Sequence, residues 1–531
     1  MGKYKRLTLL AFVLGAFTLA LFKASGWHFS YGFRLPPAVV QNVVPPPAVN
    51  KKTRRGAPRA VPAIVMGRLD AHLASSRQMT TTHAASLVEL QDGCTSAPPC
   101  RGRTSDTLLA KPADCGRRCD AVAPAPDGSA APCRDCTSDT LLAKPADCGR
   151  RCDAAAPAPE GSAPPCRGRV RAFWFSGSRE GAADVTINSA VFDPAGDSWS
   201  EEKVVTGRED TQRGLNRYIA KVGNPVVARA ANGELWLFYV TVSLGGWAGS
   251  SITLITSADD GEHWSAPRRL ITSPFLNIST LVKGAPFFYA DGTMGLPVYH
   301  EFVTKFAEIL RLDQTGKVID KQRLAAGSQG TLQPVVLVQS AQQALVLNRY
   351  AGKDAEKRVI SIATSDGGWH WQTPQKSALR NPDAALTALV LDDGKLLAVL
   401  NDQEHGRESL SLQLSTDGGA SWRELTRLEE MNGLRNAELP ESACLGVVGS
   451  LLRSSDARLR KAEPEQMAAY VASARPQILA RGACHFEFSY PYMIQTRNGD
   501  IHLAYTWNRT FIKHVRIDPD WLKHRLQEVR P

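Results

Sequence analysis

The sequence lacks the short motifs that mark common cofactor and phosphate sites. It contains no P-loop, no dinucleotide-binding fingerprint and no cluster of residues at the spacing of metal ligands. The formal net charge is +11, but no basic stripe interleaved with aromatic residues accompanies it, and part of the charge lies in a proline-rich stretch near the N-terminus. We therefore expect no cofactor, no metal ion and no nucleic-acid partner.

Sustained helical periodicity is missing from residue 170 to about residue 462. Short apolar runs separated by Gly, Asp and Asn turns occupy this stretch instead. Strands are expected at residues 235–240, 251–256, 345–348, 396–400 and 501–506. Many short strands with regular turns indicate an all-β sandwich, barrel or propeller.

The N-terminus carries three basic residues before an apolar run over residues 7–22, which is short for a transmembrane helix. No convincing cleavage site follows the run. We expect an uncleaved signal anchor over residues 1–25, with the rest of the chain facing the periplasm from the inner membrane; a cleaved signal and secretion are the alternative. Residues 26–62 are rich in Pro, Val, Ala and basic residues, which predicts a linker.

A cysteine-rich segment is duplicated, with near-copies at residues 104–133 and 137–166. It is poor in apolar residues and contains no His, so it favours neither a stacked repeat nor a zinc site. We expect residues 94–169 to be a largely disordered insertion at a hairpin tip, with no catalytic part. Its cysteines can cross-link locally in an oxidising compartment.

A second insertion is expected over residues 432–485. It is predicted to be partly helical and is bracketed by Cys444 and Cys484. In an oxidising compartment these two cysteines form a disulfide, and two buried free thiols are the alternative.

A turn motif of the form Ser/Thr-x-Asp-x-Gly-x-x-Trp recurs in the strand-rich region. Full copies begin at Ser257, Thr364 and Ser415, and a degenerate copy covers residues 193–199. The Asp carboxylate can accept backbone N–H bonds across the turn, Gly supplies a positive φ, and Trp packs under the strands. These positions are therefore expected to be structural.

The motif resembles the Asp-box (BNR) repeat of the sialidase superfamily, and the resemblance covers about residues 80–518 apart from the first insertion. It implies an all-β, six-bladed β-propeller over residues 63–531, with a glycan site at the axial mouth, away from the Asp-boxes. Sialidases hold the carboxylate of the substrate with three arginines. They use an Asp as acid/base and a Tyr nucleophile paired with a Glu.

The resemblance places these roles on particular residues. Arg349 and Arg407, each shortly before a full Asp-box, match the second and third arginines, and a guanidinium suits bidentate carboxylate binding. Asp184 matches the acid/base, and the neighbouring Arg179 orients it, contacts substrate or makes a local ion pair. Tyr490 matches the nucleophile. A surface or salt-bridged arginine and a packed tyrosine are the alternatives.

Two positions depart from the family pattern. His83 stands where the first arginine is expected, and it is neutral or partly charged near pH 7. Gln333 replaces the Glu that would accept the proton of Tyr490. Glu487 and Glu301 are the candidate substitutes, and either is equally well explained as a solvated or structural carboxylate.

Three hypotheses remain. The first is a retaining exo-glycosidase that hydrolyses terminal sialic acid or a related acidic sugar from glycans. The second, which His83 and Gln333 favour, is a propeller enzyme with another glycan substrate, such as another glycosidase or a lyase. The third is a non-catalytic glycan-binding propeller.

Overall fold

The computed structural model describes the chain in nine stretches, namely residues 31–36, 69–73, 81–91, 168–273, 277–324, 330–434, 439–456, 458–480 and 484–528. The chain divides into two compact units, residues 1–92 with 166–531, and residues 93–165. The second unit lies outside the described residues, so the described fold is that of the first unit.

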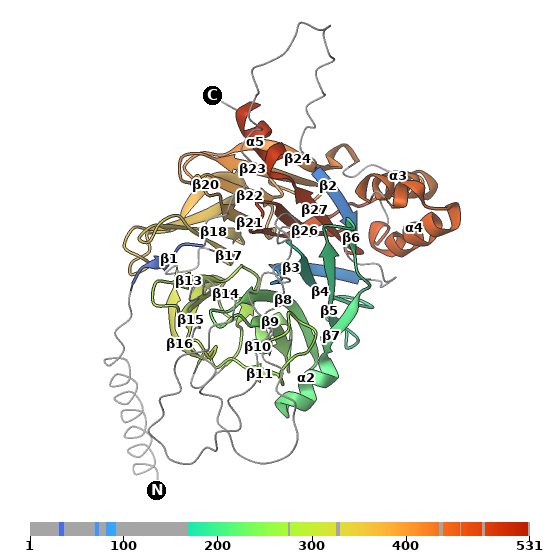
Figure 1. Cartoon of the computed structure of the whole chain (residues 1–531). Helices are drawn as coiled ribbons and strands as arrows, with labels where there is room; N and C mark the ends of the chain where they lie inside the picture. Colours follow the sequence, from blue (N-terminus) through green and yellow to red (C-terminus); the bar gives the residue numbers. More distant parts are fainter. Residues whose placement is uncertain are drawn as a thin grey trace, which may run out of the picture. The chain divides into compact units, whose positions relative to one another are not determined.

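The first three sheets are antiparallel (Figure 1). Sheet 1 contains β3 (Thr81–Glu89), β4 (Val170–Gly177), β5 (Thr186–Asp193), β6 (Ser198–Trp199) and β7 (Lys203–Gly207). Sheet 2 contains β8 (Lys221–Arg229), β9 (Leu235–Val242), β10 (Ser250–Ser257) and β11 (Arg268–Arg269). Sheet 3 contains β12 (Leu281–Val282), β13 (Phe287–Tyr289), β14 (Met294–His300), β15 (Phe306–Leu312) and β16 (Val318–Arg323), with β1 (Phe33–Arg34) at its edge.

The remaining three sheets have four strands each. Sheet 4 contains β17 (Thr331–Val338), β18 (Ala344–Tyr350), β19 (Arg358–Thr364) and β20 (Gln375–Arg380). Sheet 5 contains β21 (Thr387–Val390), β22 (Leu396–Leu400), β23 (Ser409–Ser415) and β24 (Arg423–Glu430). Sheet 6 contains β25 (Phe488–Gln495), β26 (Ile501–Trp507), β27 (Phe511–Ile517) and, at its edge, β2 (Leu69–Leu73).

The six sheets form a closed ring of blades. The innermost strand β3 contacts both β8 of the second blade and β25 of the sixth, and the sheets surround a common axis in Figure 1. β2 pairs with β27 over its whole length, so a strand from before the first blade completes the last one. The expected all-β, six-bladed propeller is confirmed, and closure leaves only short blade edges at the rim.

Burial between blades explains the strand sequences. β9, β22 and β26 are buried at every position, because neighbouring blades cover both faces of these second strands. Such strands are near-continuous apolar runs, and these are the runs that the sequence identified. The strand predicted at residues 396–400 has its observed bounds, and the others fall within observed strands.

The three full Asp-boxes have the expected turn geometry. In the first, Ser257 Oγ donates to Asp259 Oδ1 at 2.8 Å, and the same carboxylate oxygen accepts from His263 N at 2.9 Å. Gly261 has φ +93°, and its N–H donates to Ser257 Oγ at 2.8 Å. The copies that begin at Thr364 and Ser415 repeat these contacts. The motif is therefore a self-contained turn.

The Asp-boxes and the candidate site lie on opposite faces of the propeller. Since neighbouring strands are antiparallel, the innermost strand begins at the same end as the turn between the second and third strands, whereas the turn between the third and fourth lies at the other end. The full Asp-boxes are third-to-fourth turns. His83, Gln333 and Tyr490 lie near the beginnings of innermost strands, and we call their end the site face.

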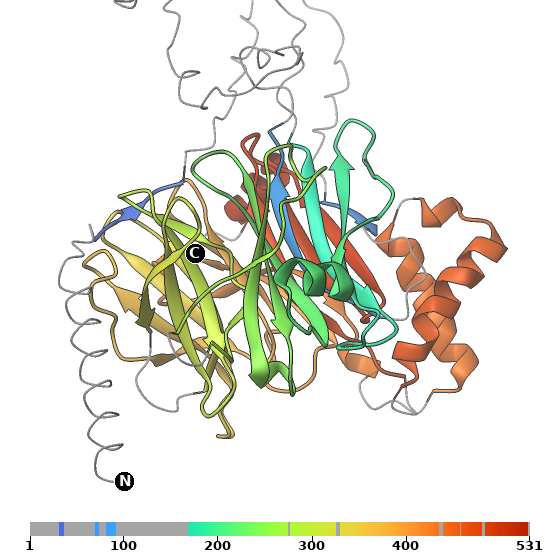
Figure 2. The same ribbon diagram turned by 90° about the horizontal axis from the view of Figure 1, so that it is seen from below.

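One helix interrupts the strands where the sequence pattern did not indicate it, because α2 (Arg208–Leu215) lies between β7 and β8. α3 (Glu441–Ser455) lies within residues 432–485, the insertion that was predicted to be partly helical. α4 (Pro464–Ile478) lies beside α3 at the rim near β2 (Figures 1 and 2), and α5 (Pro519–Glu528) follows β27. α2 therefore lies where the sequence showed no sustained helical periodicity. A helix of eight residues such as α2 is too short to give a clear 3.6-residue hydrophobic period in a window of about 11–18 residues.

The helical segment is tied to the propeller. Cys444 in α3 and Cys484 before β25 form a disulfide, with Cα atoms 5.7 Å apart. Val448 and Leu452 of α3 and Met467 of α4 are buried in a cluster shared with the fifth and sixth blades. The disulfide alternative is thus the one observed.

Part of the predicted linker belongs to the propeller. Phe33–Arg34 form β1, which pairs with Phe288 and Tyr289 of β13, and Phe33 is buried. Phe33 N donates to Ala341 O at 2.7 Å, which joins this segment to the fourth blade. A short strand in a proline-rich context gives no pattern that separates it from linker.

Two expectations fall outside the described residues. The anchor over 1–25 and the duplicated segment are not described, although β3 and β4, on either side of that segment, pair as neighbours. Among the described residues, no helix has the length and apolar character needed to cross a membrane.

Candidate active site

Bulges re-aim side chains at the beginnings of four innermost strands. The register of β3, β8, β17 and β25 shifts at this point. Each shift contains a non-glycine residue with positive φ, namely Ala84, Asn224, Gln333 and Tyr490. A non-glycine residue with positive φ destabilises the folded state by about 1–3 kcal/mol. Such residues are frequent at functional sites, where contacts with the surrounding structure keep them in this conformation.

Tyr490 lies at the centre of a polar cluster. Its Oη accepts from Gln333 Nε2 and from Arg349 Nη1, both at 3.4 Å. The Tyr490 ring also contacts His83, with ring centroids 4.2 Å apart. Gln333 Nε2 further donates to Tyr299 Oη at 3.3 Å. The structure thus brings three of the predicted site residues into direct contact with the predicted nucleophile.

Arg349 is held from two sides. Its Nε donates to Asp383 Oδ1 at 2.7 Å, and its Nη1 donates to Gln333 Oε1 at 3.2 Å. Asp383 has φ +62° and precedes β21. Arg349 is thereby held beside Tyr490 by Gln333 from its own blade and by Asp383, which precedes the first strand of the next blade.

A second ion-pair network surrounds Glu487. Its two oxygens accept from Arg407 Nη1 at 3.1 Å and from Arg509 Nε at 3.0 Å, and Ser489 Oγ donates at 2.8 Å. Arg509 Nη1 also donates to Glu180 Oε2 at 3.0 Å. Although burial alone would raise it, Arg509 and Arg407 lower the pKa of Glu487 to about 2. Glu487 is thus a firmly ionised structural partner and a weak proton acceptor.

The other candidate base has the opposite character. Burial raises the pKa of Glu301, an effect that the nearby Arg349 partly offsets. Its backbone N–H donates to Ser279 Oγ at 3.0 Å. Of the two carboxylates that the sequence offered, Glu301 is better suited to take up a proton.

His83 is buried and neutral. Burial lowers its pKa to about 4, with a further contribution from Arg509. Its Nδ1 finds no hydrogen-bond partner among the described residues. His83 therefore supplies no positive charge where the family pattern has an arginine.

Asp184 and Arg179 occupy the turn between β4 and β5. Both are exposed, and the two carboxylate oxygens of Asp184 accept from the N–H and the hydroxyl of Ser178 at 2.9 Å. The residue of this turn that joins the Glu487 network is Glu180, through Arg509. The structure thus places Asp184 on the site face, held by its own turn, and its role stays a prediction.

A buried lysine contacts the backbone of the residue that follows Tyr490. Lys283, between β12 and β13, donates from Nζ to Leu386 O at 3.2 Å and to Pro491 O, so it joins blades three, five and six. Burial lowers its pKa to about 7. The described residues contain no group of three His, Cys, Asp or Glu side chains arranged to hold a metal ion.

The recurring turns and the six blades agree with a known sequence family. The BNR repeat-like domain family matches residues 168–503, more than half of the chain. The chain belongs to this family. No curated protein matches the sequence.

Several solved structures resemble this BNR-repeat propeller at low identity. One is a Hadza microbial sialidase, with 14% identity, a match over 66% of this chain and 63% of that chain, and a TM-score of 0.47. Another is the intramolecular trans-sialidase of Ruminococcus gnavus, with 11% identity, a match over 68% of this chain and 93% of that chain, and a TM-score of 0.45. The α-L-arabinanase of Penicillium chrysogenum is similar as well, with 12% identity, a match over 66% of this chain and 90% of that chain, and a TM-score of 0.42. The match spans somewhat less than two thirds of the first of these proteins, and none assigns a substrate to this chain.

Four residues of the site were not predicted from the sequence, namely Glu180, Tyr299, Asp383 and Arg509. Arg509 follows β26 and thus lies in the second-to-third turn of its blade, as Arg407 does in the preceding one. Because Arg407 was already a candidate, the equivalent position of Arg509 in the next blade could have identified Arg509 from the sequence. The other three residues become recognisable only through their partners on neighbouring blades.

Proposed function

We propose that this BNR-repeat propeller is a retaining exo-glycosidase that removes a terminal sialic acid or a related acidic sugar. The observation that supports it is the placement of Tyr490 Oη at 3.4 Å from both Arg349 Nη1 and Gln333 Nε2. Two donors aimed at a phenol oxygen stabilise the phenolate that forms when Tyr490 gives up its proton.

In this mechanism Tyr490 Oη attacks the anomeric carbon and the bond to the departing oxygen breaks. The phenol proton passes to Glu301, and Asp184 protonates the departing oxygen. Water, deprotonated by Asp184, then attacks the anomeric carbon of the glycosyl-tyrosine, and the phenol regains its proton. Arg349 and Arg407 bind the carboxylate of the sugar.

The ion pairs of the three site arginines support a second candidate function, a glycosidase for a neutral glycan. Arg349 is paired with Asp383, while Arg407 and Arg509 share Glu487 and Glu180. The guanidinium charges of these three arginines are therefore already balanced within the protein. Since His83 is neutral, it adds no positive charge for a substrate carboxylate.

The test is turnover of a fluorogenic α-sialoside by the purified full-length chain, beside Tyr490→Phe. We expect wild-type turnover and a loss of at least about 10³-fold in the variant, because a nucleophile has been removed. Turnover of neutral glycosides in place of the sialoside would establish the second candidate. Binding of glycans without turnover of either class would refute both and leave a binding propeller.

A further inference from the structure

Exposed apolar side chains gather on one part of the site face. Eight large apolar side chains are exposed among the described residues, and five of them belong to the second and third blades at this face. Tyr218 precedes β8, Leu244 lies in the turn between β9 and β10, and Ile271 follows β11. Phe302 and Val303 lie in the turn between β14 and β15. We call these five side chains the apolar patch, because several exposed apolar residues on neighbouring segments mark an interaction surface.

Hydrogen bonds hold the segments of the patch side by side. Arg217 Nε donates to Ser243 Oγ at 2.8 Å, which joins the segment before β8 to the turn between β9 and β10. The segment that leads into β12 contacts both long turns. Thr280 O accepts from the start of β10 at 3.2 Å, and Ser279 Oγ accepts from the N–H of Glu301 at 3.0 Å. The five apolar side chains therefore belong to neighbouring segments of one surface.

The two long turns project into solvent. Leu244 is 78% exposed, while Phe302 and Val303 are 62% and 82% exposed. No atom of the described residues lies within 4 Å of the position that a Cβ would take at Gly245 or Gly246, so open space surrounds the tip beside Leu244. A folded partner would need a matching hollow for each tip, whereas a lipid surface closes around any of them.

Cations surround the apolar patch. Within two residues of it along the sequence are three cations, namely Arg217, Arg269 and Lys305. The same stretches contain one carboxylate, that of Glu301, which is half-buried and interacts with Arg349 of the candidate site. Apolar tips with an excess of cations are complementary to a layer of anionic headgroups that covers hydrocarbon.

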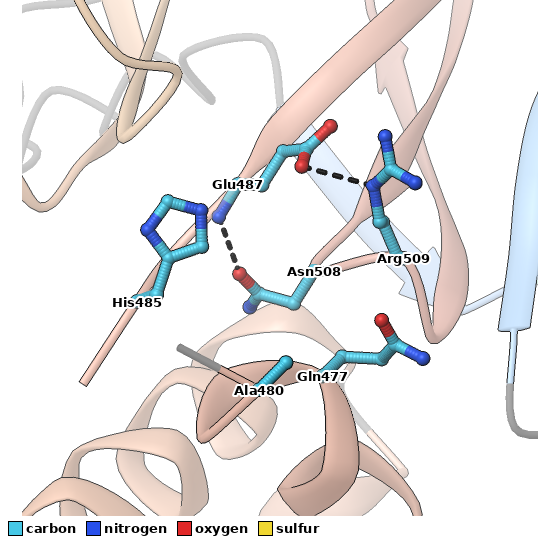
Figure 3. A pocket seen from close by; sticks show the side chains of 6 residues that line it. All are labelled: Gln477, Ala480, His485, Glu487, Asn508 and Arg509. Atoms are coloured by element: carbon cyan, nitrogen blue, oxygen red, sulfur yellow. Dashed lines mark hydrogen bonds and ion pairs between the residues drawn. The ribbon is translucent and has the colours of Figure 1, made fainter. Parts of the chain in front are cut away.

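The site face has a different character across the propeller axis, where the fifth and sixth blades meet the end of α4. A cavity of about 200 Å³ there is lined by Gln477, Ala480, His485, Glu487, Asn508 and Arg509 (Figure 3). Five of these six side chains are polar, and Glu487 pairs with Arg509. No described residue of these two blades or of α3 and α4 exposes a large apolar side chain. The apolar patch is thus confined to one side of the mouth.

We propose that the apolar patch docks the site face onto an anionic lipid bilayer, with Leu244, Phe302 and Val303 entering the interfacial layer and Arg217 and Lys305 lying among the headgroups. The inference goes beyond the proposed glycosidase function and does not depend on it, because the docking surface is complete without a substrate. Docking through one side of the mouth turns the candidate site toward glycans carried at a membrane surface.

Hydrogen exchange on the full-length chain tests the proposal, because it reports on the turns themselves. The apolar run over residues 7–22 can bind lipid on its own, so the amount of protein on vesicles is not decisive. The free chain is compared with the chain on phosphatidylcholine vesicles and on vesicles of phosphatidylcholine and phosphatidylglycerol in equal parts. We expect amides of residues 244–248 and 302–305 to exchange at least about tenfold more slowly on the mixed vesicles than in the free chain, with unchanged exchange in the Asp-box turns.

Two double variants locate the contact. Phe302→Ser with Val303→Ser removes the apolar side chains of one turn, and exchange is followed at the other turn, residues 244–248. Trp369→Ser with Val204→Ser is the matched control, because it removes an exposed aromatic and an exposed β-branched side chain from an Asp-box and from β7. We expect the first variant to lose the protection by vesicles and the control to keep it, with unchanged near-ultraviolet circular dichroism in both.

The outcomes distinguish the occupants of the patch. Protection by the mixed vesicles that the first variant abolishes supports the proposal. Equal protection by both kinds of vesicle would overturn the choice of an anionic surface. Protection already present in the free chain, whether constant or rising with protein concentration, would overturn the inference by showing that another segment or a second copy covers the turns. Wild-type turns that vesicles leave unprotected would overturn it without either variant, so the test does not depend on the variants folding.

Discussion

Glu487 joins Arg407 and Arg509, with one carboxylate oxygen on each guanidinium, at 3.1 and 3.0 Å. The two arginines follow second strands of adjacent blades, and Glu487 precedes the strand that carries Tyr490. A single buried carboxylate therefore connects two blades to the candidate nucleophile. Substitution at this position is expected to affect stability and pH response together.

Glu487→Gln is expected to destabilise the protein by about 2–4 kcal/mol at pH 7, because two partly buried guanidinium groups lose their anion. The carboxyl has a lower pKa in the native state, about 2, than in the unfolded chain. Its stabilisation is thus fully present above about pH 4.5 and is lost as the pH falls toward 2. Urea unfolding at pH 7 and pH 3 measures this. Glu424→Gln, in the exposed pair with Arg427, is the control and should change stability by less than about 1 kcal/mol.

His83 is expected to make the protein less stable in mild acid. Its pKa is about 4 when folded and about 6.5 when unfolded, so between these values the unfolded chain binds more protons. Stability should fall by up to about 3 kcal/mol as the pH drops from 6.5 to 4. His83→Gln should flatten this slope in urea titrations. Identical slopes for both proteins would show that His83 does not stay neutral when buried.

Gln333→Glu is expected to raise turnover of a glycoside substrate. The new carboxylate would accept the Tyr490 proton directly, since Gln333 Nε2 is already 3.4 Å from Tyr490 Oη, and Arg349 would neutralise its charge. General-base help of this kind gives about 10²-fold or more when well placed, so a tenfold rise in kcat is a conservative expectation. Gln339→Glu, near the third Asp-box, is the control. A fall in kcat would mean that the amide donor matters more than a base.

Loss of the Cys444–Cys484 disulfide is expected to loosen the helical segment more than the propeller. The bond closes a loop with a sequence separation of 40, for which about 2–4 kcal/mol is typical. Replacing both cysteines by Ser should increase hydrogen exchange in α3 and α4, while strands β8 to β10 keep their protection. Equal loss of protection in both regions would show that the segment and the propeller unfold as one unit.

The repeated turns could be predicted because their contacts are local. In each Asp-box the Asp, the Ser or Thr and the Gly bond within eight residues of one another, so the sequence pattern contains the whole structure. The pairing of β2 with β27 is the opposite case. It joins segments separated by more than 400 residues, and a five-residue strand gives no signal of its partner.

The candidate site was predictable in part. Arg349, Arg407, Asp184, Tyr490 and His83 were expected to converge, and contacts of Tyr490 with Arg349, His83 and the neighbouring Gln333 are observed. Arg407 contacts Glu487 instead, Asp184 is held by its own turn, and all the catalytic roles stay predictions. Arg509 was missed because its importance depends on the position of its turn within the blade. The engagement of Glu487 by two arginines could not be inferred either, since those residues lie 80 and 22 positions away.

The sequence by itself determined the all-β class, the Asp-box turns and the positions of several strands, because these depend on alternation and on turn chemistry within a few residues. The six-bladed propeller was implied by the resemblance of those turns to the Asp-box family. The tertiary structure alone decided which charges meet and which carboxylate stays ionised. Those properties arise where six blades bring distant strand beginnings to one face. Burial and pairing there set the charge state of each group, and neither is encoded in local sequence.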